Sequence, residues 1–213
     1  MSTQERKKIE KENRRNVILA AAESIMVKNG LHGLNLDLIA QETNLAKGTL
    51  YLYFKSKEEI LSILTIKARE LLLEEFKKIA VNNQLDIEKL KSIVKINYNF
   101  YKKHPLYYDL VSLYEANHQV TETEEMYESS LAINDLVVNI IQKAKEADQV
   151  QENINVAIFT LCLWGSTVGI LQLMKVRGPI MKEKMNISEE EILDTFIQMM
   201  FQGIQKQKTK KFL

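Results

Sequence analysis

The sequence predicts an all-α protein, and two features of its composition support this. The 213 residues include only seven glycines and two prolines, and alternating runs of β-branched residues are scarce; both are typical of helical proteins. Hydrophobic residues make up 46% of the chain and charged residues 27%. A chain of this length and composition can bury a real core, either as one domain or as a small domain followed by a larger one.

The net charge of +1 hides an asymmetry between the two ends of the chain. Residues 1–57 carry ten Lys and Arg against six Asp and Glu, whereas the remainder carries 19 against 22. The N-terminal end is therefore the one suited to a polyanion. The single cysteine, Cys162, rules out an internal disulfide and suits a reducing cytoplasm.

A first helix is expected from about Glu12 to Asn29, with Gly30 as its C-terminal stop. Basic residues followed by an apolar run over 17–22 superficially resemble a signal peptide, but Glu23 interrupts the run and acidic residues lie among the basic ones. The basic residues before position 16 allow two interpretations, a solvated tail or an arm that contacts nucleic acid. These residues are Arg6, Lys7, Lys8, Lys11, Arg14 and Arg15.

Two short helices joined by a tight turn are expected next. Asn35 is a good N-cap for the first, and Leu36 and Ile39 share one face of it. Asn44 stands where the chain must turn sharply, and asparagine tolerates a left-handed backbone. The second short helix is expected over residues 47–53, with Leu50 and Phe54 facing inward. Its outward-facing side chains form two pairs at helical spacing, Lys47 with Tyr51 and Thr49 with Tyr53.

A third helix is expected to begin at a capping box formed by Ser56 and Glu59. The N-terminus of this helix, with Lys57 beside it, suits an anion. Two short helices and a turn, with polar and aromatic groups projecting from the second helix, predict a helix-turn-helix. Such a motif can place its second helix in the major groove of DNA.

The run LIAQETNLAKGTLYLYFKSKEEIL, residues 38–61, resembles the DNA-binding signature of the TetR family of transcriptional regulators. The match is strongest in Lys47-Gly48-Thr49-Leu50-Tyr51-x-Tyr53-Phe54 and the following Ser56-Lys57-Glu58. The chain departs from the family pattern at Asn44, usually Gly, at Ala46, often Ser, and at Asn35, commonly Thr. The missing hydroxyl at position 46 removes a helix cap worth about 1 kcal/mol.

The resemblance implies a three-helix DNA-binding domain over residues 1–57 and a larger helical ligand-binding and dimerisation domain over residues 58–213, with about nine helices in all. Gly48 is expected to allow close approach to DNA, Lys57 to hold a phosphate, and Leu52 to contact a thymine methyl. The full set of expected DNA-binding residues is Asn35, Lys47, Gly48, Thr49, Tyr51, Leu52, Tyr53 and Lys57.

Further helices are expected over residues 57–82, 87–103, 123–147 and 188–207, and His104-Pro105 should interrupt the chain. Aromatic residues are concentrated between positions 98 and 114. They allow two interpretations, ordinary core packing or the wall of a ligand pocket. Because TetR-like regulators hold an inducer in this domain, the resemblance implies a small-molecule effector. The candidate ligand-binding residues are Tyr98, Tyr101, Tyr107, Tyr108, Tyr114 and Trp164.

Residues 154–174 contain no charged side chain. A helix of this length spans about 31 Å, enough to cross a bilayer, and Gly165-x-x-x-Gly169 matches a membrane-dimer pattern. A membrane-anchored helical protein is therefore the alternative interpretation. A soluble helix covered by its own core on one side and by a partner subunit on the other explains the same residues, and polar groups such as Asn155 and Gln172 favour it. In TetR-like proteins the last two helices form the dimer interface, which here implies a homodimer through 154–174 and 188–207.

The sequence contains no Gly-rich phosphate loop, nucleophile elbow or paired-cysteine motif, and one Glu115-x-x-His118 pair is too little for a metal site. We therefore expect no enzyme activity, cofactor or metal. The predicted function is that of a cytoplasmic, sequence-specific DNA-binding regulator. It is expected to be a ligand-responsive repressor that leaves a pseudo-palindromic operator when a small molecule binds.

Overall fold

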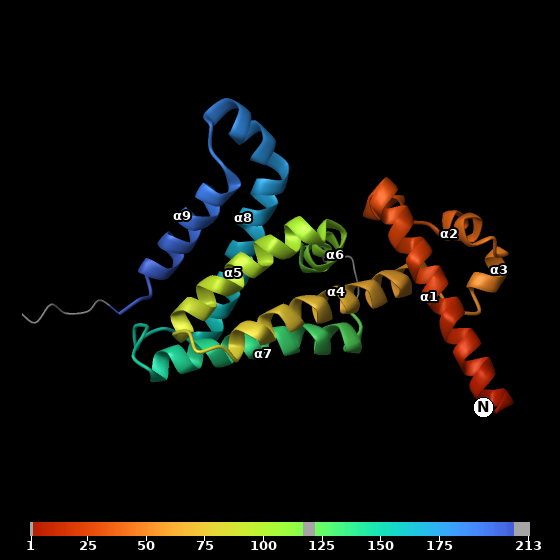
Figure 1. Cartoon of the computed structure of the whole chain (residues 1–213), viewed down its shortest axis with the longest axis horizontal. Coiled ribbons are helices and arrows are strands. Elements are labelled where there is room, and N and C mark those ends of the chain that lie inside the picture. Colours follow the sequence, from red (N-terminus) through yellow and green to blue (C-terminus); the bar gives the residue numbers. More distant parts are fainter. Residues whose placement is uncertain (1, 117–121, 207–213) are drawn as a thin grey trace, which may run out of the picture. The chain divides into compact units, whose positions relative to one another are not determined.

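The computed structural model describes residues 2–116 and 122–206, without the side chains of residues 113–116. Within these ranges the chain forms nine α-helices, one 3₁₀ helix and no β-strand, apart from an isolated antiparallel bridge between Val150 and Gln205 (Figure 1). The all-α prediction is confirmed. The helices are α1 (Thr3–Asn29), η1 (Leu31–Gly33), α2 (Leu36–Thr43), α3 (Lys47–Leu50), α4 (Lys57–Ala80), α5 (Asp86–Lys103), α6 (Pro105–Ala116), α7 (Glu124–Glu146), α8 (Val156–Met185) and α9 (Glu189–Gln202).

The chain divides into two compact units, which we describe separately. The first comprises Met1–Arg69 and His104–Tyr127, and the second comprises Glu70–Lys103 and Glu128–Leu213. Helix α4 therefore contributes its first half to one unit and its second half to the other.

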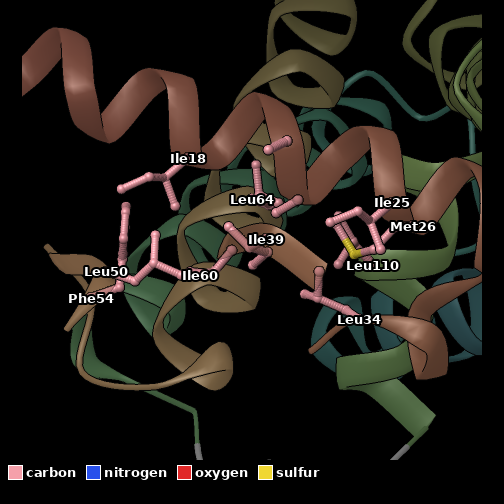
Figure 2. Packing of buried hydrophobic residues seen from close by; sticks show 12 residues of the cluster. Ile18, Ile25, Met26, Leu34, Ile39, Leu50, Phe54, Ile60, Leu64 and Leu110 are labelled. Carbon is pink, nitrogen blue, oxygen red and sulfur yellow. The ribbon is translucent and has the colours of Figure 1, made fainter. Parts of the chain in front are cut away.

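The first unit is built around one hydrophobic core, shown in Figure 2. Ile18 of α1, Ile39 of α2 and Leu50 of α3 meet in this core, together with residues of α4. Leu110 of α6 belongs to the same core and is fully buried. Burial on this scale fixes α2 and α3 against α1 and α4, so the outward face of α3 has a defined orientation.

Helix α1 begins at Thr3, nine residues before the expected start at Glu12, so that prediction was wrong. A capping box explains the earlier start, because the Ser2 hydroxyl accepts a hydrogen bond from the Glu5 N–H at 3.2 Å and the Glu5 carboxylate accepts one from the Ser2 N–H. The helix ends as predicted, since Gly30 stands in the positive-φ region at 72°.

The turn between α2 and α3 follows the prediction closely. The Asn35 side chain accepts a hydrogen bond from the Leu38 N–H at 2.8 Å and so caps α2. Asn44 adopts the left-handed conformation, with φ 52° and ψ 34°. Ala46, at the N-cap of α3, makes no side-chain cap hydrogen bond, in agreement with the missing hydroxyl.

Helix α3 ends at Leu50, three residues before the predicted end at Tyr53. The segment after it is a tighter turn, in which the N–H groups of Leu52 and Tyr53 donate to the carbonyls three residues earlier at 3.1 and 2.9 Å. Such i→i+3 bonds commonly tighten the last turn of a helix. We refer to α3 with this turn, residues 47–53, as the recognition segment.

The capping box expected at the start of α4 is present in a shifted form. The Glu59 N–H donates to the Ser56 hydroxyl at 3.3 Å as expected. The Glu59 carboxylate accepts from the N–H of Lys55, at 2.6 Å, one residue before the position that a capping box uses.

In the second unit, α8 packs against α5 and α9. Helix α5 ends at Lys103 and Pro105 begins α6, so the expected interruption at His104-Pro105 is confirmed. Helix α8 runs to Met185, eleven residues beyond the expected end at Met174. The helix continues through Gly178 and Pro179, although both residue types are unfavourable inside a helix, so its length does not follow from local propensity. Asn186, in the left-handed conformation at φ 54°, ends it.

Helix α9 opens on the predicted Ser188–Glu191 capping box and ends at Gln202, earlier than expected. Its buried stripe is Leu193, Ile197 and Phe201, whereas Met199 on the other side of the helix is exposed. Helix α8 shows the same pattern, with one buried face and apolar side chains such as Ile158 and Leu161 exposed on the other. By length and composition alone α8 could cross a membrane, and 28% of its most apolar stretch is buried inside the chain.

Candidate nucleic-acid interface

The recognition segment presents its side chains outward from a buried base. Leu50 and Phe54 are each 1% exposed in the core of the first unit, as predicted. Between them, the side chain of Tyr51 is 50% exposed and that of Leu52 is 75% exposed. Two large side chains held in solvent on an anchored turn form a surface suited to contact another molecule.

Lys47 at the start of α3 is paired with an acid across the turn. Its ammonium lies 2.8 Å from one carboxylate oxygen of Asp37 on α2 and 3.0 Å from the other. The hydrogen bond to Asp37 raises the pKa of Lys47 above its ordinary value, so this lysine is charged at neutral pH. Because both groups are exposed, a phosphate can compete with Asp37 for the ammonium.

We expect Asp37→Asn to strengthen binding to any DNA duplex by about two- to tenfold, because it frees the Lys47 charge and removes a negative charge beside it. Fluorescence anisotropy at two salt concentrations measures the change. Glu42→Gln is the matched control, since Glu42 lies on the same helix and pairs with Lys28 instead, at 3.5 Å. An equal gain in both variants would show that net charge, not the pairing of Lys47, is responsible.

Gly48 has no neighbour within 4 Å of the position where a Cβ atom would stand. Packing within the chain therefore does not require glycine here, and its backbone conformation is ordinary. The open space around Gly48 allows another molecule to approach the backbone closely.

We expect Gly48→Ala to raise the free energy of unfolding by up to about 1 kcal/mol, because alanine favours a helix over glycine. The same change should weaken operator binding by roughly tenfold, since the methyl group occupies the space of approach. Thermal unfolding and a binding titration on one sample separate the two effects. Unchanged operator affinity would remove Gly48 from the interface.

Arg15 of α1 contacts the C-terminal end of the recognition segment and helps to hold it in place. Its guanidinium donates to the backbone carbonyl of Tyr53 at 2.7 Å and lies 4.4 Å from the centroid of the Phe54 ring. Sequence reasoning missed Arg15 and Asp37, because their partners lie 38 and 10 positions away along the chain. The sequence signal for Arg15 was its place in the basic N-terminal group, which does not identify its partner, and Asp37 carried no comparable signal.

The remaining predicted DNA-binding residues differ in how exposed they are and in what their side chains contact. Asn35 uses its side-chain oxygen to cap α2, which positions that helix. Thr49 and Tyr53 are half-buried at the edge of the recognition segment, and Lys57 is exposed at the first residue of α4. The predicted residues thus lie on one continuous part of the first unit, residues 35–57.

The candidate ligand-binding residues are divided between the two units. In the second unit, the Tyr98 and Tyr101 ring centroids lie 6.4 Å apart, and Trp164 is half-buried on α8. In the first unit, Tyr108 is buried on α6, and the Tyr107 hydroxyl donates to Glu23 of α1 at 2.7 Å. The Tyr114 side chain, and the Glu115 and His118 pair, lie outside the described side chains.

Tyr98 lines a cleft of about 310 Å³ in the second unit. Its hydroxyl donates to the carboxylates of Glu189 at 3.0 Å and Glu190 at 3.3 Å. Burial, and then these carboxylates, raise the pKa of Tyr98 well above its ordinary value, so it acts as a hydrogen-bond donor. The other residues that line the cleft are Lys102, Gly178, Pro179, Lys182 and Ser188.

An anchored helix-turn-helix with an exposed recognition segment, at the basic end of an all-α chain, defines a helix-turn-helix DNA-binding protein. Comparison with known proteins agrees. Residues 18–63 match the family model of bacterial regulatory proteins of the tetR family. The HTH-type transcriptional regulator UidR of Escherichia coli (strain K12) is 24% identical over 157 residues, which cover 74% of this chain and 79% of the relative.

Two solved structures share the fold. A putative fatty acid metabolism regulator from Clostridium perfringens matches with a TM-score of 0.63 and 25% identity over 90% of this chain and 100% of that one. The regulator FadR from Bacillus subtilis, solved in complex with stearoyl-CoA, matches with a TM-score of 0.70 and 18% identity over 88% of this chain and 98% of that one.

The match over residues 18–63 and these relatives support a DNA-binding region of the TetR type and the function of a helix-turn-helix transcriptional regulator. The resemblance of residues 38–61 is confirmed by these findings. The membrane-anchored alternative is not favoured, because the TetR-like fold includes α8 as one of its own helices.

Proposed function

We propose that the protein is a cytoplasmic homodimeric repressor that binds a pseudo-palindromic operator and leaves it when a small molecule binds. The observation that carries this proposal is the outward, anchored recognition segment, with Tyr51 and Leu52 exposed above the buried Leu50 and Phe54. Residues 1–57 supply the DNA-binding function and residues 58–213 supply ligand binding and dimerisation.

Each subunit places its recognition segment in a major groove, and the two half-sites lie about one helical turn apart. Thr49, Tyr51 and Tyr53 contact phosphates or base edges, and Leu52 contacts a thymine methyl. Lys47 exchanges Asp37 for a phosphate, and Lys57 holds a phosphate at the start of α4. Tyr51 and Leu52 are exposed whereas Leu50 and Phe54 are buried in the core, and this division supports the assignments.

The homodimer forms through α8 and α9. Apolar side chains on the face of each helix turned away from its own core support this, because large exposed apolar patches mark interaction sites. Exposed apolar side chains on the two helices include Ile158, Leu161, Val176, Ile180 and Met199. A two-fold symmetric pair of these faces gives a closed dimer, which a palindromic operator requires.

The effector is a small apolar or amphipathic molecule, held by candidate residues of a single unit, either Tyr107 and Tyr108 of the first or Tyr98, Tyr101 and Trp164 of the second. The stearoyl-CoA complex of Bacillus subtilis FadR supports long-chain acyl thioesters as the first class to test. Within the first unit, Glu23 of α1 accepts hydrogen bonds from Lys67 of α4 and Tyr107 of α6, both at 2.7 Å. A shift of α6 on ligand binding reaches the DNA-binding helices through these contacts.

The ligand releases DNA only to the extent that it binds the two states with different affinity. Selection from a random duplex library tests the proposal. We expect enrichment of two inverted half-sites, and loss of the bound duplex when acyl thioesters of increasing chain length are added. Enrichment of a single half-site would contradict the dimer, and release independent of any acyl chain would contradict the effector class.

A further inference from the structure

Helix α1 projects well beyond the core to which it is attached. Its first buried residue is Ile18, and the side chains of residues 3–14 are all exposed. The projecting part, residues 3–17, is about 22 Å long at 1.5 Å per residue. An isolated helix of this length is marginal in water, so the Ser2–Glu5 capping box and its other contacts are needed to hold it.

Arg15 holds the projecting part beside the recognition segment through its bond to the Tyr53 carbonyl and its contact with the Phe54 ring. The result is a cleft of about 360 Å³ between the two elements, which we call the basic cleft. Its lining residues are Lys7, Glu10, Lys11 and Arg14 of α1, and Leu52 and Tyr53 of the recognition segment.

The charges in the basic cleft follow the period of the helix. Lys7, Lys11 and Arg14 are spaced by four and three residues, so they share one face of α1. Glu10 also lines the cleft, which leaves its wall with a net charge of +2 from three cations and one acid. Between Lys7 and Arg14 the helix rises about 10 Å, a length that spans more than one phosphate of a DNA strand.

We propose that the basic cleft holds the sugar–phosphate backbone of the DNA strand that borders the major groove occupied by the recognition segment. This inference rests on the proposed function, because the recognition segment must first enter the groove. The cleft opens directly beside Leu52 and Tyr53, so DNA that contacts these residues presents its backbone to Lys7, Lys11 and Arg14.

Because α1 is helical from its start, it can contact the DNA backbone but is too wide to enter the minor groove. The chain is helical from Thr3, and an α-helix with its side chains is about 10–12 Å across. The minor groove of B-DNA is only about 6 Å wide, which admits an extended arm but not this helix. These phosphate contacts therefore strengthen binding and position the protein on the duplex, but they do not distinguish one DNA sequence from another.

The test compares two double variants that lose the same charge. Lys7→Ala/Lys11→Ala removes cations of the basic cleft, and Arg6→Ala/Lys8→Ala removes cations that flank this face and do not line the cleft. Alanine is the best helix former, so α1 is retained in both, which circular dichroism checks. Operator affinity is measured as a function of salt, and phosphate ethylation interference locates the contacted phosphates.

For Lys7→Ala/Lys11→Ala we expect the slope of log affinity against log salt to fall by about 0.9 per lost contact, which is about 3.6 for four contacts in a dimer. Affinity for operator and unrelated duplexes should fall by the same factor, and interference should disappear at specific phosphates. For Arg6→Ala/Lys8→Ala, ethylation of those same phosphates should still interfere with binding. Glu10→Gln, which removes the acid from the cleft, should raise affinity for both duplexes.

Equal slopes and identical interference patterns for the two double variants would overturn the inference while leaving the proposed function intact. A wild-type protein that binds no duplex would overturn both. A change in operator specificity, with unrelated DNA bound as before, would also overturn it, because phosphate contacts cannot discriminate between sequences.

Discussion

Tyr51→Ala is expected to weaken operator binding by at least about 30-fold, and up to complete loss, while leaving the dimer intact. The Tyr51 side chain is half-exposed on the recognition segment and is not part of the core of the first unit. A side chain that contacts bases or phosphates is worth about 1–3 kcal/mol in each half-site. Two half-sites therefore lose about 2–6 kcal/mol, a reduction in affinity of roughly 30-fold to more than 10⁴-fold.

Two further variants show what Tyr51 contributes. Tyr51→Phe retains the ring and removes the hydroxyl, so it separates packing from hydrogen bonding. Tyr127→Ala is the matched control, because Tyr127 on α7 is 54% exposed and lies outside the recognition segment. Operator titration and sedimentation on the same samples give affinity and dimer mass together. A monomeric Tyr51→Ala, or one that binds the operator normally, would contradict the separation of roles.

Leu161→Glu is expected to convert the dimer to a monomer and to reduce operator affinity by about 10²- to 10⁴-fold. The Leu161 side chain is 70% exposed on α8, on the face turned away from the core of its own unit. In a symmetric dimer, each carboxylate would be buried against an apolar surface without a partner, which is strongly unfavourable. Loss of the dimer removes the avidity of two linked half-sites.

Val81→Glu controls for the introduction of an acid on an exposed apolar site. Val81 follows α4, is 83% exposed and belongs to neither α8 nor α9. Sedimentation over a range of concentrations should give a dimer for Val81→Glu and a monomer for Leu161→Glu. A dimeric Leu161→Glu with full operator affinity would place the interface on other helices.

Local signals in the sequence predicted most helix boundaries of the DNA-binding region. Asn35, Asn44 and Gly30 each act through their own backbone or the next turn, so their roles can be inferred from residue type and position. The same kind of signal is present at Ser2 and Glu5, but the charged residues around it allowed either a solvated tail or an arm, and neither interpretation includes a helix. The start of α1 is therefore a local feature of the sequence, encoded by the Ser2–Glu5 capping box.

Contacts between distant residues could not be predicted. The bonds from Arg15 to Tyr53 and from Lys47 to Asp37 depend on how α1, α2 and α3 pack, and no periodicity encodes that packing. The basic cleft is a consequence of the first of these contacts. The shortened α3 has the same origin, since its last turn tightens where Leu50 and Phe54 both enter the core.

The second unit shows where composition misleads. Residues 154–174 contain no charge, and this suggested a helix with those ends, but side chains on the exposed face do not define where a helix stops. The aromatic residues between 98 and 114 are close in sequence, yet Tyr98 and Tyr107 belong to different units and bond to different carboxylates. Closeness in sequence alone therefore does not establish a shared pocket.

A footprint of the purified protein on the DNA flanking its own gene, at two salt concentrations, tests the central claim most directly. We predict a protected pseudo-palindrome with half-sites about one helical turn apart, and affinity that falls steeply between the two salt concentrations. Salt-sensitive coating of the DNA without a protected site would contradict operator recognition at that locus. Complete absence of binding at low salt would contradict the assignment of the recognition segment to DNA.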